Sequence, residues 1–285
     1  MEARTGEGSP PATLETLPWQ VSIETKDKPV CGGAILSSWW ILSAAHCFMG
    51  DTFSDLQIVV GSKKDAPETR KLDRVVIHQD FNGVSLVNDV ALILLDSPVG
   101  FGDAKAPICL PLLHDLGMWR DCWVAARGPS VPAGGNAKSA HVLQKVQMSL
   151  IGREACSKQV PGLAGDVFCA VSEEGGKEAC KDSAGNPLVC TYGSHSKWFV
   201  VGVASRGGSC SGEESPAIYT IVFSYLDWIQ RASASEGKPF IPEGVDDFAE
   251  LIGDPARELE AASGACPLPA APALALVWVP LLLHF

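Results

Sequence analysis

The chain of 285 residues has too few basic residues to balance its acidic ones. It holds 22 lysines and arginines against 33 aspartates and glutamates, a formal net charge of −11. Because a protein that binds a phosphate backbone needs a basic surface, we expect no nucleic acid partner. Part of this acidity is local, since residues 236–260 hold eight acidic side chains against two basic ones.

Cysteine pairs with the spacing of a zinc or redox site are also lacking. No Cys-x-x-Cys occurs among the ten cysteines, so we expect neither a metal nor a cofactor. Ten cysteines are nevertheless many for a cytosolic protein, and they indicate an oxidising compartment.

The N-terminal residues 1–17, MEARTGEGSPPATLETL, lack the apolar run of a signal peptide. They are polar and rich in proline and glycine, and we expect them to be disordered. Two alternatives remain open. The sequence lacks its true N-terminus, or it is a product of an alternative start that is not secreted and has no stable role.

A run long enough to cross a membrane is lacking at the C-terminus. The final apolar stretch begins near Ala270 and holds about 16 residues, fewer than the roughly 20 that a spanning helix needs. Small residues at 261–265, a short spacer and this tail match a glycolipid-anchor signal. We expect attachment near Ser263 or Gly264; the alternative is a buried or unstructured apolar terminus.

The pattern between these ends is all-β. Short apolar, β-branched runs predict strands at 57–61, 90–95 and 198–204, and only 225–231 has a helical pattern. We expect four segments: a disordered segment at 1–17, a folded domain at 18–232, an acidic linker at 233–262, and an anchor signal or apolar tail at 263–285.

Six motifs follow one another through the predicted domain: PWQVSI at 18–23, CGGAILSSWWILSAAHC at 31–47, NDVAL at 88–92, PICLP at 107–111, CWV at 122–124 and PAIY at 216–219. Together they resemble the trypsin-like serine protease family. The resemblance implies two packed six-stranded Greek-key barrels with a short C-terminal helix. Together with the anchor signal, the resemblance points toward the membrane-anchored, testis-type members.

The segment 180–190, CKDSAGNPLVC, resembles the nucleophile loop of that family, CxGDSGGPLVC. Without gaps, Ala184 stands at the nucleophilic serine, Asp182 at the oxyanion-hole glycine and Ser183 at the loop aspartate, while Gly185 is retained. A methyl group cannot attack a carbonyl, and losing the nucleophile costs on the order of a million-fold in turnover. A carboxylate at the oxyanion position would repel the developing charge.

A shifted alignment leaves an alternative open. It pairs DSAG at 182–185 with the family's DSGG and makes Ser183 the nucleophile. It requires a deletion after Cys180 and an insertion of Asn186 before Pro187, within a loop that disulfides constrain at both ends.

The resemblance implies roles for three further residues. His46 would be the general base, because imidazole titrates near neutrality. Asp89 would orient it, and Ser205 would support that aspartate. This pair can also persist as a buried polar contact after a nucleophile is lost.

Activation and specificity positions depart from the family. The new N-terminus of active members begins with Ile or Val, which residues 1–20 do not contain, and Ser183 has no carboxylate to receive it. The resemblance implies a specificity pocket with Glu178 at its floor and a wall at 205–207 composed of Ser205, Arg206 and Gly207. Ala217 stands where the family has a glycine and would narrow this pocket. Glu178 indicates a retained preference for Lys or Arg, or else a solvated loop glutamate.

The resemblance also implies four disulfides: Cys31–Cys47, Cys122–Cys190, Cys156–Cys169 and Cys180–Cys210. It leaves Cys109 either as a free thiol or paired with a cysteine of an N-terminal extension, since Cys266 lies in the segment that an anchor signal would discard.

The sequence therefore predicts a catalytically inactive serine protease homologue, not an enzyme. We expect it at the extracellular face of the plasma membrane on a glycolipid anchor, or secreted, where it binds an unidentified protein partner. The alternative is an active trypsin-like endopeptidase that uses Ser183 and cleaves after Lys or Arg.

Overall fold

The computed structural model describes residues 17–242, except for residues 27, 51–52, 54, 62–66, 112, 114, 130–140, 164, 174–182, 193–196 and 208–215. Several predictions lie outside the described residues: the roles of Glu178 and Asp182, the Cys180–Cys210 pair, the anchor signal and residues 1–16 of the segment at 1–17 that was expected to be disordered. Leu17, the last residue of that segment, is buried in the hydrophobic core, so the prediction is wrong there.

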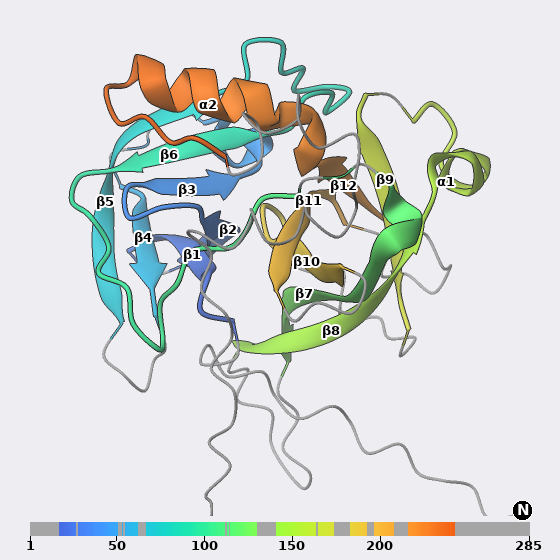
Figure 1. Cartoon of the computed structure of the whole chain (residues 1–285), viewed down its shortest axis with the longest axis horizontal. Helices are drawn as coiled ribbons and strands as arrows, with labels where there is room; N and C mark the ends of the chain where they lie inside the picture. Colours follow the sequence, from blue (N-terminus) through green and yellow to red (C-terminus); the bar gives the residue numbers. More distant parts are fainter. Residues whose placement is uncertain are drawn as a thin grey trace, which may run out of the picture.

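Within the described residues, twelve strands form two closed antiparallel barrels of six strands each (Figure 1). The first barrel has the order β1-β2-β3-β6-β5-β4. Its strands are β1 Gln20–Thr25, β2 Lys28–Ile35, β3 Trp40–Ser43, β4 Gln57–Val60, β5 Glu68–Ile77 and β6 Ala91–Leu95.

The second barrel has the order β10-β11-β12-β9-β8-β7. Its strands are β7 Trp119–Pro129, β8 His141–Ile151, β9 Val167–Ser172, β10 Pro187–Tyr192, β11 Trp198–Arg206 and β12 Ala217–Ile221. The two-barrel fold that the resemblance implied is confirmed, and so are the three strands predicted from apolar runs.

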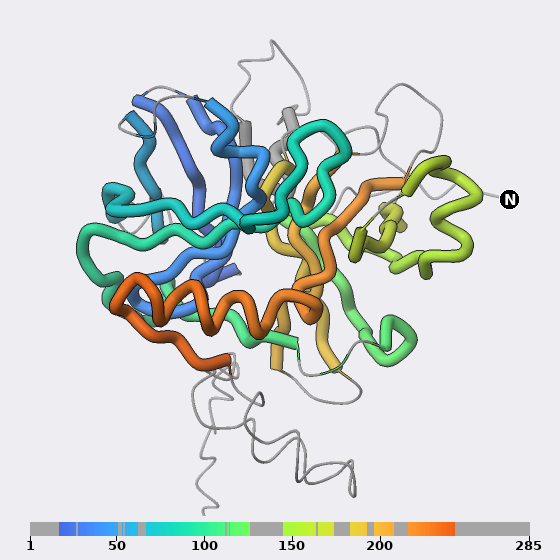
Figure 2. The backbone as a smooth tube through the Cα atoms, turned by 90° about the horizontal axis from the view of Figure 1, so that it is seen from above, coloured from blue at the N-terminus to red at the C-terminus, as the bar shows by residue number. Residues whose placement is uncertain are grey.

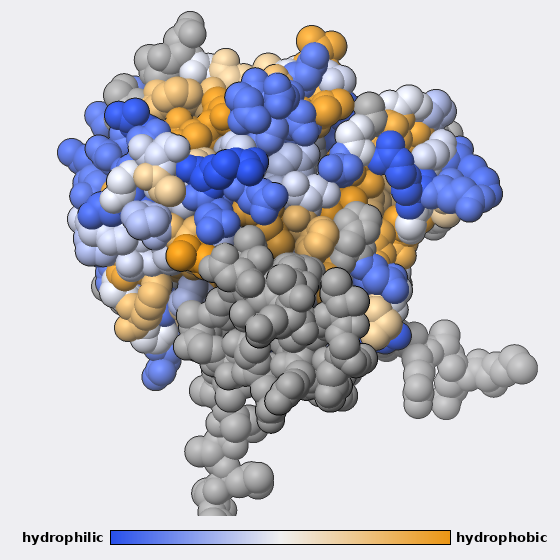
Figure 3. All heavy atoms as spheres, turned by 45° about the horizontal axis from the view of Figure 1, so that its top comes forward, coloured by the Kyte–Doolittle hydropathy of each residue, from blue (hydrophilic) through white to orange (hydrophobic). Residues whose placement is uncertain are grey.

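Two α-helices occur in the described part, α1 Arg153–Gln159 and α2 Leu226–Ser235, with 3₁₀ turns at Ala45–Phe48, Leu116–Met118 and Val222–Tyr225. Helix α2 extends from the junction between the barrels along the first barrel (Figure 2). It buries Leu226, Trp228 and Ile229 while Asp227 stays exposed, the spacing that one apolar face of a helix requires. The face that carries α2 mixes hydrophilic with hydrophobic side chains (Figure 3).

The packed body continues beyond α2 to Pro242. Trp40 donates from Nε1 to the carbonyl of Lys238 at 2.7 Å, and the Lys238 amine lies 3.9 Å from the ring centre of Trp39. The first residues of the predicted linker therefore contact the first barrel. None of the helices in the described ranges is both long and apolar enough to cross a membrane.

Three hydrophobic clusters explain the arrangement of the barrels. One fills the first barrel with side chains such as Ile41 and Ile93, and another fills the second barrel around Phe168 and Tyr219. A third lies between them and includes residues of both barrels and of α2, among them Trp40, Val200 and Trp228. The polar site described below lies at this junction.

Candidate active site

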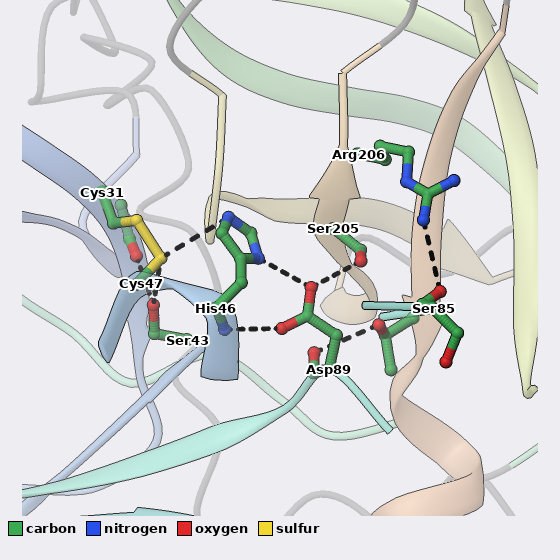
Figure 4. Close-up of polar contacts among 10 residues, drawn as sticks. Cys31, Ser43, His46, Cys47, Ser85, Asp89, Ser205 and Arg206 are labelled. Carbon is green, nitrogen blue, oxygen red and sulfur yellow. Dashed lines mark hydrogen bonds and ion pairs between the residues drawn. A yellow bond between two sulfur atoms is a disulfide. The ribbon is translucent and has the colours of Figure 1, made fainter. Parts of the chain in front are cut away.

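His46 and Asp89 come together from two segments of the first barrel. His46 lies in the 3₁₀ turn that follows β3, and Asp89 lies two residues before β6. Nδ1 of His46 lies 2.7 Å from Oδ2 of Asp89, and the backbone N–H of His46 donates to Oδ1 at 2.8 Å (Figure 4). A carboxylate only accepts hydrogen bonds, so Nδ1 of His46 is the donor in this pair.

Asp89 is fully buried, and the second barrel completes its hydrogen bonding. The hydroxyl of Ser205, at the end of β11, donates to Oδ2 of Asp89 at 2.5 Å. The hydroxyl of Thr220 on β12 donates to the Asp89 backbone carbonyl at 3.1 Å. The structure thus brings His46, Asp89 and Ser205 into one network across the barrel junction.

The backbone before Asp89 is held by a tyrosine. Tyr225 donates from its hydroxyl to Oδ1 of Asn88 at 2.9 Å, and Asn88 has a positive φ of 57°. Burial raises the pKa of Tyr225 to about 12, and the carboxylates of Asp166 and Asp89 act in the same direction. The phenol therefore stays protonated, and it remains a donor over the physiological range.

The Cys31–Cys47 disulfide joins the 3₁₀ turn that carries His46 to β2. Cys47 Sγ lies 4.0 Å from Nε2 of His46. Cys31, His46 and Cys47 are the group of three potential metal ligands found among the described residues. Because the two sulfurs are bonded to each other, they have no thiolate to offer a metal ion.

Residues 183–186 form a tight turn beside the Cys31–Cys47 disulfide. The N–H of Asn186 donates to the carbonyl of Ser183 at 2.9 Å, and Gly185 has a φ of 72°. A positive φ at the third position is the requirement of a type II turn, which explains the glycine. The turn is also attached to the first barrel, since the N–H of Gly32 donates to the carbonyl of Ala184 at 2.8 Å.

Ser183 and Ala184 have different surroundings in this turn. Ser183 is buried, with 3% of its surface exposed. Ala184 is partly exposed and packs against the hydrophobic cluster of the first barrel, which contains Cys31 and Phe48. Neither residue hydrogen-bonds to His46, and among the described residues no hydroxyl lies within hydrogen-bonding distance of its Nε2.

The pocket positions are described only in part. Arg206 is exposed and donates from Nη2 to the carbonyl of Ser85 at 3.2 Å, which joins the end of β11 to the loop before Asp89 (Figure 4). Gly207 is exposed beside it, and Ala217 begins β12 opposite Ala170 of β9.

Three of the four implied disulfides are present in the described residues: Cys31–Cys47, Cys122–Cys190 and Cys156–Cys169. Cys109, for which a free thiol was one alternative, is disulfide-bonded. Its partner lies outside the described residues. The free-thiol alternative is therefore wrong.

One residue of the site was missed at the sequence level. The sequence indicated Asn186 only as an insertion in the shifted alignment, yet its buried side chain bonds to Gln20 and to the carbonyl of Ala125. An asparagine where the family motif has glycine was the available signal.

Comparisons with known proteins agree with this architecture. A family model described as Trypsin matches residues 6–229. Coagulation factor XI of Bos taurus is 31% identical over 224 residues, which cover 74% of this chain and 35% of that protein. The chain thus spans about a third of the length of this curated relative.

Proposed function

This chain belongs to the trypsin family of serine proteases, and we propose that within that family it is a catalytically inactive member that acts by binding a protein. The observation that carries the proposal is the position of Ala184. It occupies the partly exposed place in the turn beside the Cys31–Cys47 disulfide, while Ser183 is 3% exposed and makes no hydrogen bond to His46. A general base with no adjacent hydroxyl has no nucleophile to activate.

The hydrogen bonds around Asp89 would stabilise the fold even in a protein that has no catalytic activity. The backbone N–H and Nδ1 of His46 and the hydroxyl of Ser205 all have their acceptor on Asp89, and each of these donors would lose it if the carboxylate were removed. Stability alone is therefore a sufficient reason for His46 and Asp89 to persist.

A fluorophosphonate probe tests inactivity, because it reacts with a serine that an adjacent base activates. The purified full chain should remain unlabelled under conditions in which an active family member is labelled completely. Stoichiometric labelling that disappears in Ser183→Ala would contradict the proposal.

The second candidate is an active endopeptidase that uses Ser183 and cleaves after Lys or Arg. The intact hydrogen bonds of His46 to Asp89, and of Asp89 to Ser205, favour it, since a working base needs this support. It predicts cleavage of Lys and Arg ester substrates that Ser183→Ala abolishes and Ala184→Gly leaves unchanged.

A protein partner would find exposed side chains beside the site. We define the rim surface as Met49, Val84 and Arg206. Met49 is 59% exposed and Val84 is 93% exposed, and Arg206 adds an exposed cation. The side chain of Met49 also lies close to Gly83, the residue that precedes Val84. Apolar side chains with a nearby cation are typical of a protein-binding surface.

A photocrosslinking residue placed at Val84 tests this surface on intact cells. We expect a discrete protein adduct that Arg206→Glu weakens. The same residue placed at Lys158, which is exposed on α1, serves as the control. Equal adducts from both positions would argue against the rim surface.

We further propose that the protein is held at the outer cell surface by a glycolipid anchor near Ser263 or Gly264. The small residues and apolar tail at 261–285 support this, as the oxidised cysteines support export. A phosphatidylinositol-specific phospholipase should release the protein from cells. Retention after treatment, with a known anchored protein released in parallel, would contradict it.

A further inference from the structure

The side chain of Asn186 lies buried between the two barrels, with 3% of its surface exposed. Its Oδ1 accepts a hydrogen bond from Nε2 of Gln20 at 2.8 Å, and its Nδ2 donates to the carbonyl of Ala125 at 2.7 Å. Gln20 belongs to β1 of the first barrel, and Ala125 belongs to β7 of the second. One amide group therefore connects both barrels through the 183–186 turn.

The carbonyl of Ala125 needs this donor. Strand β10 pairs with β7 through Leu188 opposite Val124, so the next pair along the two strands would place Pro187 opposite Ala125. Proline has no N–H, and a buried carbonyl without a donor costs free energy. The Asn186 side chain supplies the donor that the backbone of β10 lacks at this position.

Two glycines make room for the turn. A Cβ atom on Gly32 would lie 1.5 Å from Oδ1 of Asn186, so only glycine fits opposite the amide. A Cβ atom on Gly185 would lie 2.6 Å from both the carbonyl oxygen of Gly32 and Oγ of Ser43. The fit between the turn and β2 is therefore close on both sides of Asn186.

Backbone hydrogen bonds fix the same segment to β11. The N–H of Gly185 donates to the carbonyl of Ala204 at 2.8 Å, and the N–H of Ala204 donates to the carbonyl of Asn186 at 3.0 Å. With the bond from Gly32 to Ala184, the turn is tied to four strands, and Asn186 provides both of the side-chain links.

We propose that Asn186 is the positioning residue that holds the 183–186 turn between the barrels. The side-chain hydrogen bonds of Asn186 to Gln20 and Ala125 therefore keep this turn formed in the uncleaved chain. The family motif has a glycine at the position of Asn186, and a glycine has no side-chain amide to make these bonds. Ser183 stands where the motif has an aspartate, so it has no carboxylate to pair with a charged N-terminus. A turn that is formed without cleavage would give the protein-binding surface the same shape before and after any cleavage of the chain. This consequence rests on the proposed binding function.

Hydrogen exchange measured on the full, uncleaved chain tests this inference. The amides of Gly185 and Gly32 should be protected in the parent and should exchange at least tenfold faster in Asn186→Ala. Amides of β12 should be unchanged. Gln20→Ala removes one of the two side-chain links and should raise exchange at the same two amides by less. It should have no additional effect in the Asn186→Ala background.

Asn82→Ala is the matched control. The side chain of this exposed asparagine also makes two hydrogen bonds, and its Oδ1 accepts both, from the N–H groups of Val84 and Ser85. Its loss should speed exchange only within 82–88.

The inference is overturned if the Gly185 and Gly32 amides exchange freely in the uncleaved parent, or if Asn186→Ala leaves their rates within a factor of two. If Asn186→Ala does not fold, Gln20→Ala decides, and parent-like rates in that variant overturn the inference. Labelling of the parent by the fluorophosphonate probe would contradict the proposed inactivity but would not affect the exchange rates that test the role of Asn186. Failure of one proposal can therefore be distinguished from failure of the other.

Discussion

The carboxylate of Asp89 accepts from both the imidazole and the backbone N–H of His46, at 2.7 and 2.8 Å. Ser205 adds a third donor at 2.5 Å, and no part of Asp89 is exposed. A buried carboxylate with three donors holds two barrels together, whatever chemistry occurs beside it. The strength of this network can therefore be measured as stability.

Replacing Asp89 with alanine should lower the free energy of unfolding by about 3 kcal/mol, because each buried donor left without an acceptor costs roughly 1–3 kcal/mol. His46→Ala should cost about 1 kcal/mol, since Asp89 then keeps the bond from Ser205 and the backbone bond. Urea denaturation at pH 7 measures both. Equal losses in the two variants would show that the network does not depend on the carboxylate.

Gly185→Ala should destabilise the protein much more than Gly237→Ala. Both glycines have a positive φ, 72° and 73°, and each substitution carries the backbone cost of about 1–2 kcal/mol. A Cβ atom at Gly237 would meet nothing within 4 Å, whereas at Gly185 it would collide with Gly32 and Ser43. We expect Gly185→Ala to cost at least about 2 kcal/mol more in thermal unfolding. A difference near zero would contradict the close fit of the turn.

Removing the Cys31–Cys47 disulfide, with both cysteines replaced by alanine, should cost about 3 kcal/mol. Its sequence separation is 16, and the chain-entropy cost for loops of this length is about 3 kcal/mol. The Cys156–Cys169 pair, with a separation of 13, should cost about the same. Only the first variant should shift the NMR signals of the His46 ring, since only that disulfide holds its turn. A shift in both would point to global loosening.

His78 makes stability depend on pH. Burial lowers the pKa of His78, Asp80 opposes this shift and Arg231 adds to it. Its Nδ1 also accepts the N–H of Asp80 at 3.2 Å, which requires a neutral nitrogen. The unfolded chain therefore binds the proton more readily, and stability falls as the pH drops through about 6.5 toward the lowered value.

His78→Phe should weaken that pH dependence. The substitution keeps a ring against Tyr225 and Trp228 and removes the titrating group. Free energies of unfolding at pH 7.5 and 5.5 should differ less in the variant than in the parent. An unchanged difference would assign the dependence to other groups.

The motifs that carry the family resemblance predicted the two-barrel fold, and local apolar runs predicted three of its strands. The apolar runs that became β4, β6 and β11 could be recognised because strand pattern depends on neighbouring residues. The helix pattern at 225–231 was confirmed as α2, although the helix runs to Ser235 and the chain remains packed to Pro242. The end of the packed region depends on Trp39 and Trp40, which are far away in the sequence and gave no local signal.

The sequence by itself determined the family and three of the barrel strands, because the motifs and the apolar runs that indicate them are contiguous residues. Only the tertiary structure decided the environments of Ser183 and Ala184, one buried and the other facing the first barrel. It also decided the role of Asn186, whose partner Gln20 is 166 positions away. Hydrogen bonds between such distant residues form only when both barrels close and bring their strands together, so no stretch of sequence records them.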